Sequence, residues 1–220
     1  MSICKRRDPN KKKIAVVVMG DVDRSPRMIN HALSIANLTK DYQADLIGYR
    51  GNSLPQAVEE NQRIRPRYLS TKFLKMIQQM PKALYLLYAV MRIIFQVMQL
   101  FYIFLSEHYD YVLMQNPPCV PLLLVLVILK ATRLSKSKII IDWHNYGYSI
   151  MRVNKVNKAL VFIGKVYEMR LAKWGDYHLC VSKAMQVDLI HKFGIDKLKA
   201  PRVLYDKATN KFKDPLPGGL

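Results

Sequence analysis

Runs of apolar, often β-branched residues alternate along the chain with segments of helical periodicity. The first run, at residues 14–19, follows charged residues and predicts a buried strand of a parallel sheet. Apolar residues then recur at helical spacing between residues 28 and 36, and residues 44–49 predict a second strand. The chain is therefore predicted to open with a strand, a loop, a helix and another strand.

The same alternation continues toward the C-terminus. Further strands are predicted at residues 61–68, 109–115, 138–142, 177–181 and 202–204, and further helices at 120–129, 156–173 and 182–193. This order is typical of a doubly wound α/β sheet with mostly parallel, Rossmann-like topology. Such sheets bind ligands at the carboxyl ends of their strands, so the loops after the strands are the candidate sites.

One predicted helix stands out by its apolar content. It begins at Leu84, ends at Leu105, and carries a single charge, Arg92. Arg92, Gln96 and Gln99 follow one another at helical spacing and form a narrow polar stripe. A transmembrane helix would bury this charge and two amides at its centre, which is costly. We therefore expect an amphipathic helix that contacts the membrane interface or the sheet.

Composition adds a strong positive charge. The 220 residues include 35 lysines and arginines but only 16 aspartates and glutamates, so the net charge is +19. Residues 1–13 are rich in cations and are expected to form a basic leader. The surplus favours a phosphate-rich partner or an anionic membrane face. A nucleic-acid partner is not expected, because the sequence contains no recognisable RNA- or DNA-binding motif.

A glycine-containing turn follows the first predicted strand and leads into the first helix. It includes Gly20, Asp21, Arg24 and Ser25, and Arg27 lies in the first turn of the helix. Ser25 is a good N-cap residue, and a helix N-terminus presents free N–H groups to an anion. Both arginines are candidates for phosphate contacts, and Gly20 allows a ligand close to the backbone. A capped helix with solvated arginines is an equal alternative.

The densest polar cluster runs from Asp142 to Ser149, directly after the strand predicted at residues 138–142. His144 is a candidate general base, because its ordinary pKa lies near neutrality, and Asp142 is either its orienting partner or the base itself. Trp143, Asn145 and Tyr146 are candidates for holding a sugar, since aromatic rings stack on sugar faces and amides bond sugar hydroxyls. The alternative is a turn in which Asp142 and His144 only bond each other.

Two further positions carry weaker signals. Asn116 precedes two prolines at a strand end, where its amide faces either a ligand or only a stiff turn. For Glu168 we expect a structural salt bridge with Lys165 or Arg170. The histidines and the three isolated cysteines show no metal-ligand spacing, so we expect no metal and no cofactor, and a reducing compartment.

Three segments resemble the chitobiosyldiphosphodolichol β-mannosyltransferase family. They are VVVMGDVDRSPRM at residues 16–28, QNPP at 115–118 and IDWHNYGYSIM at 141–151. Shorter similarities at 167–168, 180–185 and 205–207 extend the resemblance in order from about residue 14 to 207. The first and third segments are long and unusual, so the resemblance is specific.

The resemblance implies a GT-B fold, of which residues 14–207 would form the N-terminal, acceptor-side domain. The family transfers mannose from GDP-mannose to GlcNAc2-pyrophosphate-dolichol in a β-1,4 linkage, with inversion, on the cytosolic face of the endoplasmic reticulum membrane. Other glycosyltransferases of the N-glycosylation pathway are implied partners. The resemblance places the acceptor pyrophosphate near Gly20, Asp21, Arg24, Ser25 and Arg27, and the sugar near Asn116, Asn145 and Tyr146, with His144 or Asp142 as the base.

The sequence departs from the family pattern at both ends. A basic leader stands where family members usually have a membrane anchor, and residues 208–220 resemble a linker. The half that would bind GDP-mannose, which carries a Glu-x7-Glu pair in related enzymes, is expected to be absent. GDP-mannose would then be a partner only if a second half is supplied. A non-catalytic membrane-associated partner and an inert fragment are the alternatives.

Overall fold

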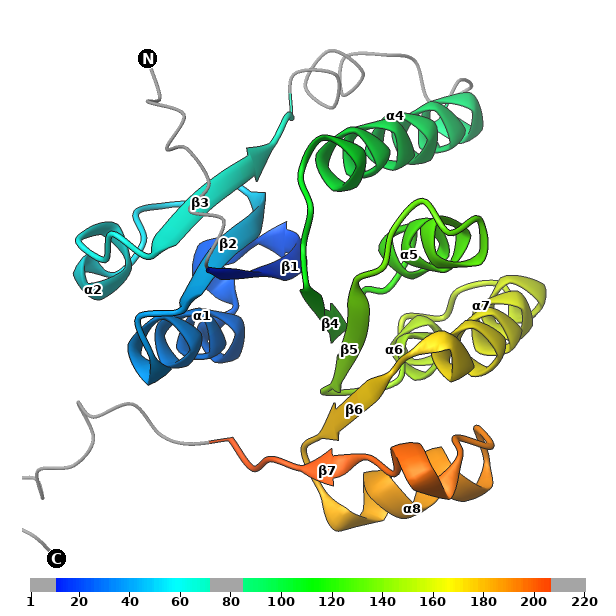
Figure 1. Cartoon of the computed structure of the whole chain (residues 1–220). Coiled ribbons are helices and arrows are strands. Elements are labelled where there is room, and N and C mark those ends of the chain that lie inside the picture. The colour runs from blue at the N-terminus through cyan, green and yellow to red at the C-terminus, as the bar shows by residue number, and fades with distance from the viewer. Residues whose placement is uncertain (1–10, 72–84, 207–220) are drawn as a thin grey trace, which may run out of the picture.

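The computed structural model describes residues 11–71 and 85–206 (Figure 1). At its centre is a seven-stranded parallel sheet in the order β3-β2-β1-β4-β5-β6-β7. The strands are β1 (Lys12–Asp21), β2 (Tyr42–Tyr49), β3 (Ile64–Leu69), β4 (Tyr111–Asn116), β5 (Lys138–Trp143), β6 (Tyr177–Cys180) and β7 (Arg202–Val203). The predicted doubly wound α/β fold is confirmed, and every pairing between the described strands is parallel.

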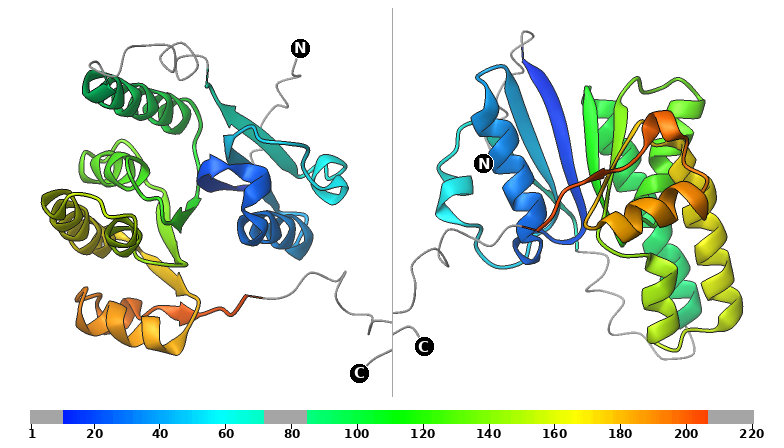
Figure 2. Two further views of the ribbon diagram at one scale, coloured as in Figure 1. Left: turned by 180° about the vertical axis from the view of Figure 1, so that it is seen from behind. Right: turned by 90° about the horizontal axis from the view of Figure 1, so that it is seen from below.

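Helices cover both faces of the sheet. They are α1 (Pro26–Leu38), α2 (Gln56–Glu59), α4 (Tyr85–Ser106), α5 (Leu122–Ala131), α6 (Gly147–Val153), α7 (Lys158–Leu171) and α8 (Lys183–His191), with short 3-10 helices at Val22–Arg24, Ala172–Trp174 and Lys197–Lys199. The helices α1 and α2 lie on one face, whereas α4, α5 and α7 lie on the other (Figure 2). Among the described residues, we find no helix whose length and apolar content would let it span a bilayer.

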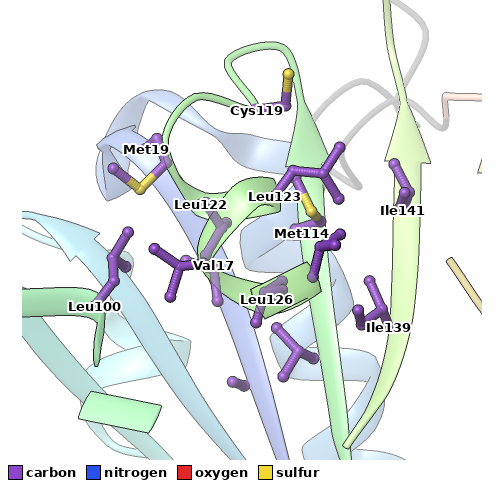
Figure 3. Close-up of a cluster of buried hydrophobic side chains, with 14 of the residues drawn as sticks. Val17, Met19, Leu100, Met114, Cys119, Leu122, Leu123, Leu126, Ile139 and Ile141 are labelled. Atoms are coloured by element: carbon purple, nitrogen blue, oxygen red, sulfur yellow. The ribbon is translucent and has the colours of Figure 1, made fainter. Parts of the chain in front are cut away.

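Alternate residues of β1 point into two separate cores. Val16 and Val18 pack on the side of α1 and α2, whereas Val17 and Met19 pack on the side of α4 and α5. Figure 3 shows the second core, where Val17 meets Leu122 of α5. Burial on both faces explains why the first strand is a continuous apolar run rather than an alternating one.

The order of the strands reverses between β1 and β4, in the middle of the sheet. Ile14 of β1 pairs with Ala44 of β2 on one side and with Tyr111 of β4 on the other. In doubly wound sheets the loops after the strands on either side of such a reversal enclose a crevice for ligands. Here these loops follow Asp21 and Asn116, two residues that the sequence had already marked as candidates.

The predicted elements need a few corrections at their boundaries. Lys12 and Lys13, expected in the basic leader, begin β1, and the polar loop after Asp142 is cut short because α6 begins at Gly147. The predicted apolar helix corresponds to α4, although residue 84 lies outside the described part. The rest of the predicted leader, at residues 1–10, and the linker-like segment at 208–220 also lie outside it.

Candidate active site at the carboxyl edge of the sheet

A polar cluster surrounds Asp142 at the carboxyl end of β5. The Asp142 side chain is completely buried. Arg27 of α1 donates two hydrogen bonds to it, from Nε to Oδ2 at 2.7 Å and from Nη2 to Oδ1 at 2.9 Å. Nε2 of His31 lies 3.0 Å from Oδ2, and Nε2 of His144 lies 3.2 Å from the same oxygen. The cluster thus joins α1, β5 and the loop after β5.

These partners decide between the two candidate bases. Burial by itself raises the pKa of Asp142, but the hydrogen bonds from the two imidazoles and the guanidinium outweigh it and hold the pKa well below its usual range. A carboxylate that keeps its charge so firmly is a poor proton acceptor at neutral pH. Because the carboxylate can only accept, His144 donates its Nε2–H and leaves Nδ1 as an acceptor. The geometry therefore favours His144 as the base and Asp142 as its orienting partner.

Arg27 donates four hydrogen bonds within the protein. Its Nη1 donates to the carbonyl oxygen of Leu204 and to Oδ1 of Asp206, both at 2.8 Å. With the two bonds to Asp142, every guanidinium nitrogen has a partner. In this structure Arg27 therefore ties α1 to β5 and to the segment after β7, and its expected contact with the pyrophosphate stays a prediction.

The loop after β1 is more open. The Arg24 side chain is 77% exposed, and its ion-pair partner, Oδ2 of Asp21, lies 3.7 Å away. Ser25 occupies the N-cap position of α1 as predicted, but its side chain makes no capping hydrogen bond. A Cβ atom at Gly20 would meet only Cγ1 of Val18, at an ordinary 3.8 Å, so packing does not require glycine there. This loop is compatible with an anionic ligand.

Asn116 lies next to His144. Its carbonyl oxygen accepts from the backbone N–H of His144 at 2.9 Å, and its Nδ2 donates to the carbonyl oxygen of Asn145 at 3.4 Å. The side chain is buried, and its Oδ1 has no hydrogen-bond partner among the described residues. Since buried polar atoms are normally paired, an unpaired Oδ1 at this strand end is unusual. The exposed Asn145 stands beside it.

Of the two aromatic candidates, Trp143 belongs to the core, whereas Tyr146 is only partly buried against it. Trp143 is completely buried, and its Nε1 donates to Nδ1 of His178 at 3.2 Å. The Tyr146 ring stacks on Phe193 and Tyr148, with ring centroids 5.2 Å and 5.6 Å away, and its hydroxyl is buried. Trp143 therefore offers no free face to a sugar, which corrects that expectation, whereas the expected sugar contact of Tyr146 stays a prediction.

Glu168 fastens α6 to α7 instead of forming a surface ion pair. Its side chain is buried, Oε1 accepts from the N–H of Gly147 at 2.7 Å, and Oε2 accepts from Tyr148 at 3.4 Å. Among the described residues it makes no salt bridge with Lys165 or Arg170, so that expectation was wrong. Burial raises the pKa of Glu168 in spite of these hydrogen bonds. The Glu168 carboxyl lies at the N-terminus of α6, a favourable place for a negative charge. The sequence pattern did not indicate this role, because it did not predict α6.

Two pockets flank the loop after β4. The first, of about 270 Å³, lies between this loop, α6 and α7 and has Glu168 in its wall. The second, of about 350 Å³, lies between the loop and α4, where Arg92 and Gln96 line it. Pro118 and Val120 contribute to both. No group of three histidine, cysteine or acidic side chains within the described residues is arranged to hold a metal ion.

Sequence comparisons give close relatives, although no family model matches the chain. Chitobiosyldiphosphodolichol β-mannosyltransferase of Candida albicans is 31% identical over 212 residues, which covers 95% of this chain and 45% of the relative. The enzymes of Kluyveromyces lactis and Pongo abelii are 34% and 35% identical, and cover 92% and 95% of this chain. The chain spans 42% and 43% of these two relatives, so it matches less than half of their length.

Solved glycosyltransferases of the GT-B type share the fold. Sucrose-phosphate synthase from Thermosynechococcus elongatus superimposes with a TM-score of 0.59 at 13% identity, covering 94% of this chain and 51% of that one. The lipopolysaccharide outer core galactosyltransferase WaaB gives a TM-score of 0.52 at 13% identity, covering 91% of this chain and 46% of that one. These structures show one Rossmann-like half of such a fold. By its sequence, the chain is similar to chitobiosyldiphosphodolichol β-mannosyltransferases over 92–95% of its own length, and it spans less than half of theirs.

Proposed function

We propose that this chain provides the acceptor-binding part of a mannosyltransferase that transfers mannose from GDP-mannose to chitobiosyl diphosphate dolichol. The observation that carries the proposal is the 31–35% identity to curated β-mannosyltransferases over 92–95% of the chain. The names of those relatives specify the dolichol-linked acceptor. The GDP-mannose donor and the inverting β-1,4 transfer follow from the resemblance alone, and the donor would bind to a second half.

His144 is the proposed general base of the transfer. Its Nδ1 would take the proton from the attacking hydroxyl of the acceptor sugar while the hydroxyl oxygen forms a bond to C1 of mannose. The bond between C1 and the phosphate oxygen breaks, and GDP leaves with the electron pair. An inverting displacement needs one such base, and Asp142 would hold the imidazole in the right orientation through Nε2. Asn116 and Asn145 would bind the hydroxyls of the acceptor sugar.

The loop after β1 is the proposed pyrophosphate site. Arg24 is exposed and weakly paired, and Gly20 leaves the backbone uncrowded. The N-terminus of α1, which begins after Ser25, adds a partial positive charge. Asp21 would position the Arg24 guanidinium. Arg27 would act mainly through Asp142, because four of its five N–H groups already bond within the protein.

The proposed place of action is the cytosolic face of the endoplasmic reticulum membrane, where the family resemblance puts this reaction. A dolichol-linked acceptor implies association with a membrane. The exposed apolar side chains of α4 support contact between this helix and the membrane interface. Other glycosyltransferases of the pathway would be partners there.

Calorimetric titration tests acceptor binding directly. A short-chain, detergent-soluble chitobiosyl diphosphate lipid is expected to bind the full chain, whereas GDP-mannose is not. Arg24→Gln is expected to weaken acceptor binding about tenfold or more, because a charge-assisted contact is lost. Arg133→Gln is the matched control, since Arg133 is also exposed but follows the C-terminal end of α5. Equal weakening by both variants, or no acceptor binding, would contradict the proposed site.

A second experiment tests the role of His144. Mannose transfer is measured after the donor-binding half of a relative has been added to the chain. His144→Gln is expected to slow the transfer about 100-fold or more, while acceptor binding stays within twofold, because a base acts in the transition state. His191→Gln, at an exposed position on α8, should leave the rate unchanged. An unchanged rate in His144→Gln would remove it as the base.

A further inference from the structure

The helices on one face of the sheet expose much apolar surface. The helices α4, α5, α7 and α6 follow one another over this face (Figures 1 and 2). Most of the exposed large hydrophobic side chains of the described residues lie on these four helices, whereas α1 on the opposite face exposes only Leu38. On the hairpin formed by α6 and α7, the exposed apolar residues are Ile150, Val153, Leu160, Phe162, Ile163 and Val166.

The apolar side of α7 therefore lacks a cover. Its periodicity places Leu160, Ile163 and Val166 on one side of the helix, as in a helix that packs on a core. The structure leaves Leu160 and Ile163 more than half exposed, at 52% and 60%. Tyr167, which follows Ile163 by one helical turn on the same side, is partly buried against the core, as are Met169 and Leu171 near the end of the helix. The N-terminal half of α7 thus extends beyond the core with its apolar residues uncovered, which indicates an interaction surface.

The charges on the same four helices have one sign. Glu168 is their single acidic residue, and it is buried beneath the start of α6. The hairpin carries five exposed cations, which are Arg152, Lys155, Lys158, Lys165 and Arg170. Because no exposed carboxylate interrupts this surface, it is complementary to a negatively charged partner.

We propose that the α6–α7 hairpin docks on an anionic phospholipid bilayer. Apolar side chains would enter the interface, and the long lysine and arginine side chains would reach the lipid phosphates. This surface is separate from α4, the helix that the sequence indicated for membrane contact. The proposal deepens the proposed function, on which it rests for the presence of a membrane.

The hairpin is attached to the edge of the sheet that carries the candidate base. The helix α6 begins at Gly147, three residues after His144, and Glu168 fixes that start to α7. At its other end, Val153 is 75% exposed and is followed by Lys155 in the turn to α7. Docking through this turn would hold His144 near the lipid surface, where a lipid-linked sugar is found.

Vesicle flotation of the full chain tests the proposal. Binding is compared between phosphatidylcholine vesicles and vesicles that also contain phosphatidylserine. The chain is expected to bind the anionic vesicles, and added salt should release it. Lys155→Gln with Lys158→Gln should weaken binding about 25-fold, since each cation near an anionic surface contributes about fivefold. Val153→Ser with Phe162→Ser should weaken binding about tenfold or more.

Two control variants lie on the opposite face. Leu38→Ser changes an exposed apolar residue, and Lys40→Gln changes an exposed cation, as the hairpin variants do. Both control variants should bind vesicles like the unchanged chain. Absence of vesicle binding, or binding that both hairpin variants leave unchanged, would overturn the proposal. The proposal would also be overturned if light scattering showed that the unchanged chain is a dimer and that the hairpin variants are monomers, because the hairpin would then bind a second copy of the chain. Acceptor binding in detergent, measured in parallel, separates this failure from a failure of the proposed function.

Discussion

At the scale of single residues, burial and hydrogen bonding separate residues that look equivalent in the sequence. Asp142 and His144 stand two positions apart, yet one is a completely buried, ion-paired carboxylate and the other is a partly exposed imidazole that contacts it through Nε2. Arg24 and Arg27 differ in the same way, because one is solvated and the other holds three parts of the fold together. In the proposed function, each pair therefore divides into a group that contacts the ligand and a group that positions other side chains.

Asp142→Asn tests how much the buried charge of Asp142 contributes to stability. The amide cannot balance the charge of Arg27, which is itself largely buried, with 11% of its side chain exposed. Removing one partner of a buried ion pair typically costs about 3–5 kcal/mol, so we expect a loss of that size in the free energy of unfolding, measured with urea. Asp206→Asn is the control, because its carboxylate binds the same arginine but is 71% exposed. That variant should lose less than about 1 kcal/mol.

Glu168→Gln tests the buried carboxyl between α6 and α7. Because the pKa of Glu168 is raised in the folded state, its contribution to stability is complete below its ordinary pKa of 4.5 and is lost as the pH rises through the folded pKa. Glutamine keeps an acceptor for Gly147 but does not ionise. The melting temperature of Glu168→Gln relative to the unchanged chain should therefore increase from about pH 4 toward neutrality. The exposed Glu59→Gln should show no such trend.

At the scale of elements, α4 reverses the usual arrangement of an amphipathic helix. Two of its polar residues bond to other parts of the protein. Gln96 is buried and donates to the hydroxyl of Tyr49, and Oε1 of Gln99 accepts from the N–H of Ser70 at 2.6 Å. Many of its apolar residues point outward instead, Met98 among them. Periodicity identified the polar stripe correctly, but amphipathicity by itself does not say which side faces solvent.

Gln96→Leu tests the inward orientation of the stripe. The substitution leaves the Tyr49 hydroxyl without this donor in the interior, so we expect a loss of about 1–3 kcal/mol in the free energy of unfolding. Met98→Gln adds a polar group to the exposed side of the same helix, where the side chain is 58% exposed, and should change stability by about 0.5 kcal/mol or less. Equal stability of the two variants would contradict this orientation of α4.

At the scale of the whole molecule, contacts between distant parts of the chain hold the sheet and its helices together. Arg27 connects α1 to Asp142, 115 residues further along, and to the segment after β7. Trp143 of β5 donates to His178 of β6 in the interior of the second core. Breaking such a contact should therefore destabilise the whole sheet rather than one loop.

Acid unfolding provides a test at this scale. Burial, aided by the charge of Lys199, lowers the pKa of His178 to about 4. The stability that neutral His178 contributes is complete above its ordinary pKa of 6.5 and is lost as the pH falls toward about 4, by about 3 kcal/mol. His178→Asn retains an acceptor for Trp143 and should remove this slope from urea-unfolding measurements. The exposed His191→Asn should keep it.

The sequence by itself determined the local features of this protein and their order. Strands, helices and their alternation follow from the periodicity of apolar residues, and the alternation leads to the parallel sheet and to a site at its carboxyl edge. Close similarity to the mannosyltransferases was also visible in short motifs. These features depend on residues near one another in the chain, so that a local pattern is sufficient to predict them.

Only the tertiary structure decided which side chains meet. Arg27 pairs with Asp142, and Glu168 accepts from the N–H of Gly147, so both contacts join residues from different elements. The burial of Trp143 likewise depends on neighbours from other elements. A periodic pattern identifies a face of a helix or strand, but the neighbour of that face depends on sheet order and register. For the same reason, only the fold shows that the N-terminal half of α7 extends beyond the core and leaves its apolar residues exposed.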